Sequence, residues 1–121
     1  MISVDQATAD DIARFFGGIR LTEEFFGLAG RKGRLVVGIG GVIKSPEGQW
    51  RGFMDVPDHV KTPMIYRYAK RILAEASARG AKSVQVACDD QVPRASEFLE
   101  RLGFIPTEEV QNNMVIWVWQ H

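Results

Sequence analysis

The chain has 121 residues, 45% of them hydrophobic and 25% charged, which is the composition of one globular domain spanning residues 1–121. Lysine and arginine together number 15, as do aspartate and glutamate, so the formal net charge is zero and the chain lacks the basic surplus of nucleic-acid-binding modules and of proteins drawn to anionic membranes. Cys88 is the only cysteine, neither histidine has the spacing of a metal motif, and no apolar run approaches the ~20 residues that span a bilayer.

A single cysteine cannot form an intramolecular disulfide, which fits a reducing compartment. The N-terminal residues Met1–Asp5 contain neither a basic region nor a long apolar run, unlike a secretory signal. We therefore expect a cytoplasmic protein with no metal site and no membrane or nucleic-acid partner.

The first quarter of the chain predicts a strand, a helix and a second strand. Residues Ile2–Gln6 read as a short strand. Thr8 can cap a helix over Ala9–Phe16, and two aspartates fall in its positive first turn. The apolar residues that follow are compatible with a strand or a short helix, and we favour a strand over Glu24–Ala29.

Two longer strands come next. Arg31–Gly33 resembles a hairpin turn, and Leu35–Ile43 is rich in β-branched residues, which indicates a strand. Three glycines within that strand suggest a bulge or a close backbone contact. The turn signal Ser45–Gly48 separates it from a strand over Gln49–Val56, whose alternate residues Trp50, Met54 and Val56 share one face.

The clearest helix opens at Thr62 and Pro63. Threonine is a good cap, and proline suits the first helical position because the missing N–H has no partner there. The helix carries an apolar stripe and ends at Gly80, and a strand is predicted over Ser83–Cys88.

A second helix over Pro93–Leu102 and two strands, Phe104–Glu109 and Met114–Trp119, complete the chain. The predicted order is β-α-β-β-β-α-β-α-β-β. Helices between later strands imply an α/β domain with a mixed, twisted sheet and helices on both faces.

The helix and turn over Ala95–Phe104 (ASEFLERLGF), preceded by the strand Ser83–Cys88 and a polar loop, resemble the last conserved block of the GNAT superfamily. Val56-Pro57 and the two residues after it resemble the segment that follows the superfamily's fourth strand. The resemblance implies an acyl-CoA N-acyltransferase (GNAT) fold and transfer of an acetyl group from acetyl-CoA to an amine. Small, divergent sequences of this kind also occur in bacteriophage genomes.

In the superfamily, the cofactor pyrophosphate is bound by backbone amides in a Q/R-x-x-G-x-G/A loop at a helix start, where free N–H groups and the helix dipole favour anions. The resemblance implies a coenzyme A site here that includes seven residues: Met54, Asp55, Val56, Lys61, Thr62, Met64 and Ile65. The loop is degenerate, because Val60, Pro63 and Ile65 occupy its three signature positions. Lys61, His59 and Arg67 can supply compensating positive charge.

Two further family positions also differ. The asparagine that bonds the pantetheine arm corresponds to Val92, and the tyrosine that protonates the leaving thiolate corresponds to Leu99. The fourth and fifth strands splay apart in this fold, so the candidate general bases are Asp55, at the end of the fourth strand, and Asp89 or Asp90, after the fifth. Each can equally be a solvated strand-end or turn residue, and Cys88 is more simply a small core residue than a nucleophile.

Two functions therefore remain open from the sequence. One is an acetyl-CoA-dependent N-acyltransferase with a degenerate cofactor loop. The other is a non-catalytic GNAT-fold structural or interaction protein, for instance in a bacteriophage particle, which would place it in the virion. Apolar strand residues near the C-terminus favour a homodimer or another protein partner. A metabolite-binding domain is a third reading, which rests on the fold alone.

Overall fold

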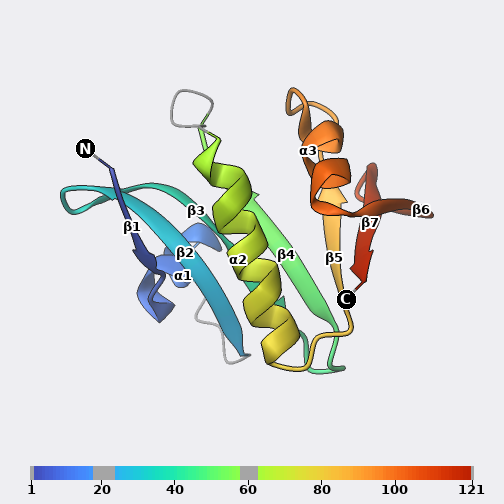
Figure 1. Ribbon diagram of the computed structural model, residues 1–121, viewed down its shortest axis with the longest axis horizontal. Coiled ribbons are helices and arrows are strands. Elements are labelled where there is room, and N and C mark those ends of the chain that lie inside the picture. Colours follow the sequence, from blue (N-terminus) through green and yellow to red (C-terminus); the bar gives the residue numbers. More distant parts are fainter. Residues whose placement is uncertain (1, 18–23, 58–62, 121) are drawn as a thin grey trace.

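The structure is a computed structural model that describes residues 2–17, 24–57 and 63–120. Its elements follow the predicted order (Figure 1): β1 (Ser3–Gln6), α1 (Ala9–Phe15), β2 (Phe25–Lys32), β3 (Leu35–Lys44), β4 (Trp50–Asp55), α2 (Met64–Ala78), β5 (Ser83–Cys88), α3 (Ala95–Leu102), β6 (Ile105–Gln111) and β7 (Met114–Gln120).

All the strands belong to one seven-stranded sheet with the order β1-β2-β3-β4-β5-β7-β6. Neighbouring strands run antiparallel except β4 and β5, which are parallel and are connected through α2. Helix α1 packs on one face of the sheet, and α2 and α3 lie on the other (Figure 1). The predicted α/β class, mixed sheet and two-sided helical cover are confirmed. No helix within the described ranges is long and apolar enough to cross a membrane.

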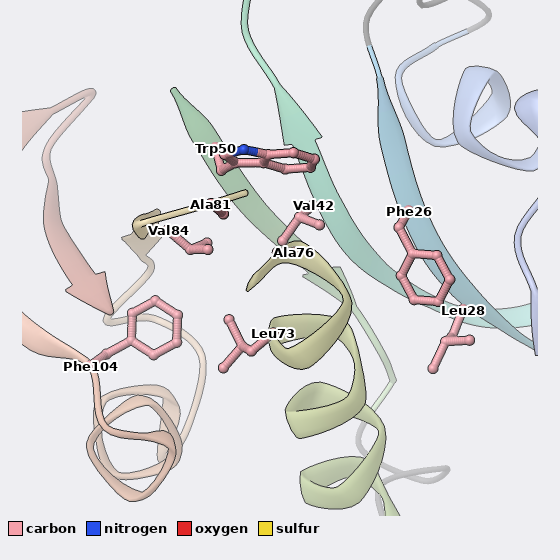
Figure 2. Close-up of a cluster of buried hydrophobic side chains, with 9 residues drawn as sticks. All are labelled: Phe26, Leu28, Val42, Trp50, Leu73, Ala76, Ala81, Val84 and Phe104. Carbon is pink, nitrogen blue, oxygen red and sulfur yellow. The ribbon is translucent and has the colours of Figure 1, made fainter. Parts of the chain in front are cut away.

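The main core lies between the sheet and α2. Nine buried side chains form it and converge there in Figure 2: Phe26, Leu28, Val42, Trp50, Leu73, Ala76, Ala81, Val84 and Phe104. They come from four strands, from α2 and from the segments that flank α2 and β6. Burial of this apolar surface is the main stabilising contribution to the fold.

Helix α1 closes the opposite face. Thr8 and Asp11 form a capping box, in which the Asp11 N–H donates to the Thr8 hydroxyl over 3.1 Å and the Thr8 N–H donates to the Asp11 carboxylate over 2.8 Å. Ile12 is fully buried against Ala29 and Ile39 of the sheet. The predicted cap is confirmed, and the helix ends one residue before the predicted Phe16.

The β2–β3 hairpin differs from the prediction. Arg31 and Lys32 belong to β2 rather than to a turn, and the reversal falls after them, where Gly33 has a φ of +64°. Arg31 is held in the strand because its guanidinium donates to Asp5 over 2.9 Å and to Asp11 over 2.5 Å. Segment 24–29 was compatible with a strand or a short helix, and the strand we favoured is present from Phe25 onward.

Both later helices begin after their predicted starts. Pro63 is the N-cap of α2, so the helix begins at Met64, and the predicted cap Thr62 lies outside the described residues. Helix α3 begins at Ala95 because Arg94 adopts a left-handed φ of +64°, which is incompatible with a helix running from Pro93.

The last hairpin is irregular. The turn residues Asn112 and Asn113 both have positive φ, and Gln111 belongs to β6 rather than to the turn. The pairing of β6 with β7 shifts register between Pro106 and Val110. The Thr107 hydroxyl donates to the Ile116 carbonyl over 2.7 Å and accepts the Glu109 N–H over 3.2 Å, which satisfies backbone groups at this bulge.

Candidate functional site

Strands β4 and β5 diverge soon after they start. Of their residues, all of which are described, only Trp50 pairs with Val84 and Arg51 with Gln85. The rest of β4 therefore turns a strand edge toward β5 without pairing to it. The splay that the sequence resemblance implied between these strands is present.

A cleft of about 710 Å³ opens over this gap on the face of the sheet that carries α2 and α3. The helices supply its two walls, with Ile65 and Ile72 from α2 and Phe98 and Leu99 from α3. Its volume falls within the range of about 300–1,000 Å³ that small-molecule and cofactor sites occupy.

Four of the predicted cofactor residues line this cleft. Met54 and Val56 come from the end of β4 and the residue after it, and Met64 and Ile65 come from the first turn of α2. The segment that joins the two elements includes Lys61 and Thr62, which lie outside the described residues.

Asp55 does not line the cleft. It pairs with Ile39 across β3 and β4, and paired residues point to the same side of a sheet. Ile39 belongs to the core under α1, so the exposed Asp55 side chain faces the side of the sheet opposite the cleft.

Asp89 lines the cleft at the end of β5. Its carboxylate accepts the Gln91 backbone N–H over 2.9 Å, while Asp90 accepts the Gln91 side-chain amide over 3.3 Å. Asp89 and Asp55 therefore lie at the ends of adjacent strands, with Asp89 in the cleft and Asp55 on the opposite face. Asp90, the alternative to Asp89, does not line the cleft.

Cys88 also lines the cleft and is buried. Burial raises the pKa of its thiol, and the negative charges of Asp90 and Asp89 raise it further. A thiol is nucleophilic as the thiolate. Cys88 therefore has the environment of a core cysteine.

Val92 and Leu99 both line the cleft and present apolar surface to it. The sequence resemblance matched these two residues to the family's asparagine and to its proton donor. Among the described lining residues, only Tyr68, Cys88, Asp89 and Arg94 carry an ionisable side chain.

The N-terminus of α2 is at the cleft wall. Pro63 makes no capping hydrogen bond through its side chain, and the first turn carries no acidic residue. The first N–H groups of a helix have no intrahelical partner and carry partial positive charge. On the opposite wall, Arg94 precedes α3 and forms an exposed ion pair of 3.2 Å with Glu97.

Sequence reasoning missed the glycine floor of the cleft. Gly30, Gly38, Gly40 and Gly52 all line it, and they come from three neighbouring strands. The glycines of β3 were noticed as a sign of a bulge or close contact, and a register shift does occur there: Gly30 pairs with Gly38 and Arg31 with Val36, which leaves Val37 without a partner in β2. The sequence did not predict that these glycines would leave open space in the cleft.

The described residues contain no cluster of three or more side chains that could hold a metal ion. The cleft has an apolar interior, a helix N-terminus and a few polar groups at one end, which are features of small-molecule sites.

No protein-family model and no curated protein sequence matches the chain, but solved structures do. A GNAT-family acetyltransferase from Staphylococcus aureus Mu50 matches with a TM-score of 0.73 and 9% identity over 99% of each chain. A Bacillus subtilis acetyltransferase in complex with CoA has a TM-score of 0.68 and 10% identity over 100% of this chain and 99% of its own. YncA from Salmonella typhimurium, solved with its cofactor acetyl-CoA, has a TM-score of 0.68 and 11% identity over 99% of this chain and 94% of its own. The chain has the GNAT fold.

Proposed function

We propose that this GNAT-fold chain is an acyl-CoA-dependent N-acyltransferase, which transfers an acyl group from a coenzyme A thioester to an amine. The observation that carries the proposal is the divergence of β4 from β5 after Arg51 and Gln85, with a cleft directly over the gap. An unpaired strand edge inside a cleft offers backbone donors and acceptors to an extended ligand such as the pantetheine arm.

The cofactor phosphates would lie at the first turn of α2. Its N–H groups favour anions, and no acidic side chain opposes them there. Arg67 would add positive charge from the first turn of α2, and Arg94 would add it from the opposite wall. Lys61, which precedes the helix in the sequence and lies outside the described residues, is a further candidate cation. The solved relatives that contain CoA or acetyl-CoA support this cofactor class.

In the proposed reaction, the amine nitrogen bonds to the thioester carbon and the carbon–sulfur bond breaks. A carboxylate, directly or through water, takes the proton that the amine loses, and the departing sulfur takes a proton to give the CoA thiol. Asp89, which lines the cleft, would act from within it. Asp55 would act on an amine that reaches the gap from the α1 face.

The apolar residue at the position of the family's proton donor limits the rate of the proposed reaction. With Leu99 in the place of a proton donor, the thiolate would leave without help from that position. Positioned acid catalysis contributes about 10²–10⁴-fold, so we expect a slow enzyme. Tyr68 is the one hydroxyl among the described lining residues and is the alternative donor.

Calorimetric titration with CoA and acetyl-CoA tests the proposal. Ile65→Asp would place a negative charge in the first turn of α2, where the helix dipole tolerates it but where it would repel the phosphates. We expect at least a tenfold loss of CoA affinity, which added salt would reduce. Ile65→Asn is the matched uncharged control and would retain binding. No binding of either ligand at millimolar concentration would refute the proposal.

A second candidate, a non-catalytic interaction protein, is favoured by a separate surface. Edge strand β6 is almost wholly exposed, and it presents Ile105 at 68% and Val110 at 59% exposure beside the exposed Val115 of β7. Exposed apolar surface of this kind is a feature of protein interfaces. Light scattering at high concentration tests whether a second copy covers it: a dimer that Ile105→Glu dissociates supports this surface, and a strict monomer counts against the homodimer.

A further inference from the structure

The cleft extends well beyond the gap at which an acetyl group would react. Its described lining includes Leu28 and Gly30 of β2 and Gly38 of β3, under the N-terminal half of α2. A thioester located between β4 and β5 would occupy only one part of this space. The remainder is open to a larger group attached to the same carbonyl.

The space exists because the floor lacks side chains. A Cβ atom on Gly38 would have Val56 as its nearest neighbour at 3.5 Å, and one on Gly40 would approach Met54 Cγ at 3.6 Å and Ile72 Cδ1 at 3.8 Å. These are ordinary contact distances, so the backbones do not need glycine for close approach. The effect of glycine at these two positions is to leave space between the sheet and α2.

The walls of this part of the cleft are apolar. Helix α2 contributes Ile65, Tyr68, Ala69 and Ile72, of which only Tyr68 carries a polar group, and the floor contributes Leu28 and the glycines. The charged side chains of the described lining, Asp89 and Arg94, lie beyond the end of β5. Polarity therefore falls from the gap toward the region under α2.

From this gradient we infer that the preferred acyl group is a medium-length aliphatic chain, which extends from the thioester into the space under α2. The inference rests on the proposed function and names its donor class. An amine acceptor does not fit this region, because a protonated amine needs a carboxylate and the only described lining carboxylate is Asp89. An alkyl chain needs no polar partner.

The test is an affinity series with CoA, acetyl-CoA, butyryl-CoA and octanoyl-CoA. Burial of one methylene is worth roughly a fourfold gain in affinity, so we expect octanoyl-CoA to bind at least ~100-fold tighter than acetyl-CoA. Ala69→Leu puts a larger side chain on the cleft wall and would remove most of this gain while CoA binding persists. Ala74→Leu is the matched control, because Ala74 is exposed on the same helix and does not line the cleft.

Affinity that is flat across the series, with CoA still bound, would overturn the inference and leave the proposed function standing. Equal chain-length gains in the wild type and in a stably folded Ala69→Leu variant would also overturn it. If octanoate binds but no CoA compound does, both the acyl-CoA donor and the proposed function are refuted. If none of these ligands binds, both are refuted as well.

Discussion

Gly41 of β3 lies so close to Phe26 of β2 that a Cβ atom on Gly41 would be 2.6 Å from the Phe26 carbonyl oxygen. The neighbouring Gly40 points to the other face, where the nearest atom to its Cβ would be the Phe53 carbonyl oxygen at 3.4 Å. Two adjacent glycines in one strand therefore have different physical roles.

Alanine substitutions separate these roles. Gly41→Ala would force two backbones apart, and we expect a loss of about 2–3 kcal/mol or more of the free energy of unfolding. Gly40→Ala would stay within about 1 kcal/mol of wild type, on the stabilising side, because alanine restricts the unfolded chain. Urea unfolding measures both, and equal midpoints for the two variants would contradict the assignment.

The Asp11 carboxylate supports the packing of α1, since it is only 7% exposed and pairs with Arg31. Asp11→Asn keeps an oxygen for the Thr8 N–H but loses the charge that Arg31 requires. We expect a loss of about 1–3 kcal/mol in the free energy of unfolding. Asp10→Asn, an exposed change in the same helical turn, is the control and would stay within about 0.5 kcal/mol of wild type.

The same carboxylate gives a pH signature. The hydrogen bond from Arg31 lowers the pKa of Asp11 below its ordinary 3.8, against the opposing effect of burial. A lowered folded-state pKa stabilises the protein fully above the unfolded value and progressively less as the pH falls through the folded value. The stability difference between wild type and Asp11→Asn should therefore be constant from neutral pH to about pH 5 and should shrink below pH 4. A difference that grows in acid would contradict this pairing.

The candidate bases can be told apart by paired amide variants. Asp89→Asn can still accept the Gln91 N–H, so the loop should persist while proton abstraction is lost. If Asp89 is the base, kcat falls about 10²–10⁴-fold with little change in the KM for acyl-CoA, and Asp55→Asn stays near wild type. The reverse result would assign the role to Asp55 and to an amine that approaches from the α1 face. Wild-type rates in both variants would exclude both carboxylates.

Cys88 should be unreactive in the folded protein. Its raised thiol pKa and its burial reduce both the thiolate fraction and the access of reagents. We expect iodoacetamide to alkylate it at neutral pH at least roughly tenfold more slowly than in the urea-unfolded chain. Equal rates in the two states would contradict this expectation and reopen a nucleophilic role.

Where local signals decide structure, the sequence was sufficient. Thr8 with Asp11 specified the start of α1, β-branched residues specified β3, and Gly103 ended α3 in the left-handed conformation. The misplaced β2–β3 turn has a non-local cause. Arg31 pairs with residues 26 and 20 positions away, so no window around the turn contains the reason for its strand conformation.

The candidate site, too, has one part that the sequence could predict and one part that it could not. Met54, Val56, Met64 and Ile65 were predicted from the resemblance to the GNAT cofactor loop, and all four line the cleft because they flank a strand end and a helix start. Strand alternation places Met54 on the cleft face and Asp55 on the opposite one. The open floor could not be predicted, because whether Gly40 leaves a cavity depends on Met54 and Ile72, which approach it only in the folded state.

The bulge in β6 has a consequence for how the molecule meets others. A regular edge strand is a template to which a further strand can add. Pro106 lacks an amide hydrogen, and the Thr107 hydroxyl already occupies the Glu109 N–H, so this edge presents an interrupted set of donors. Strand-to-strand polymerisation is thereby disfavoured. A partner that covers Ile105 and Val110 would associate through side-chain packing, which is more easily reversed than growth of the sheet.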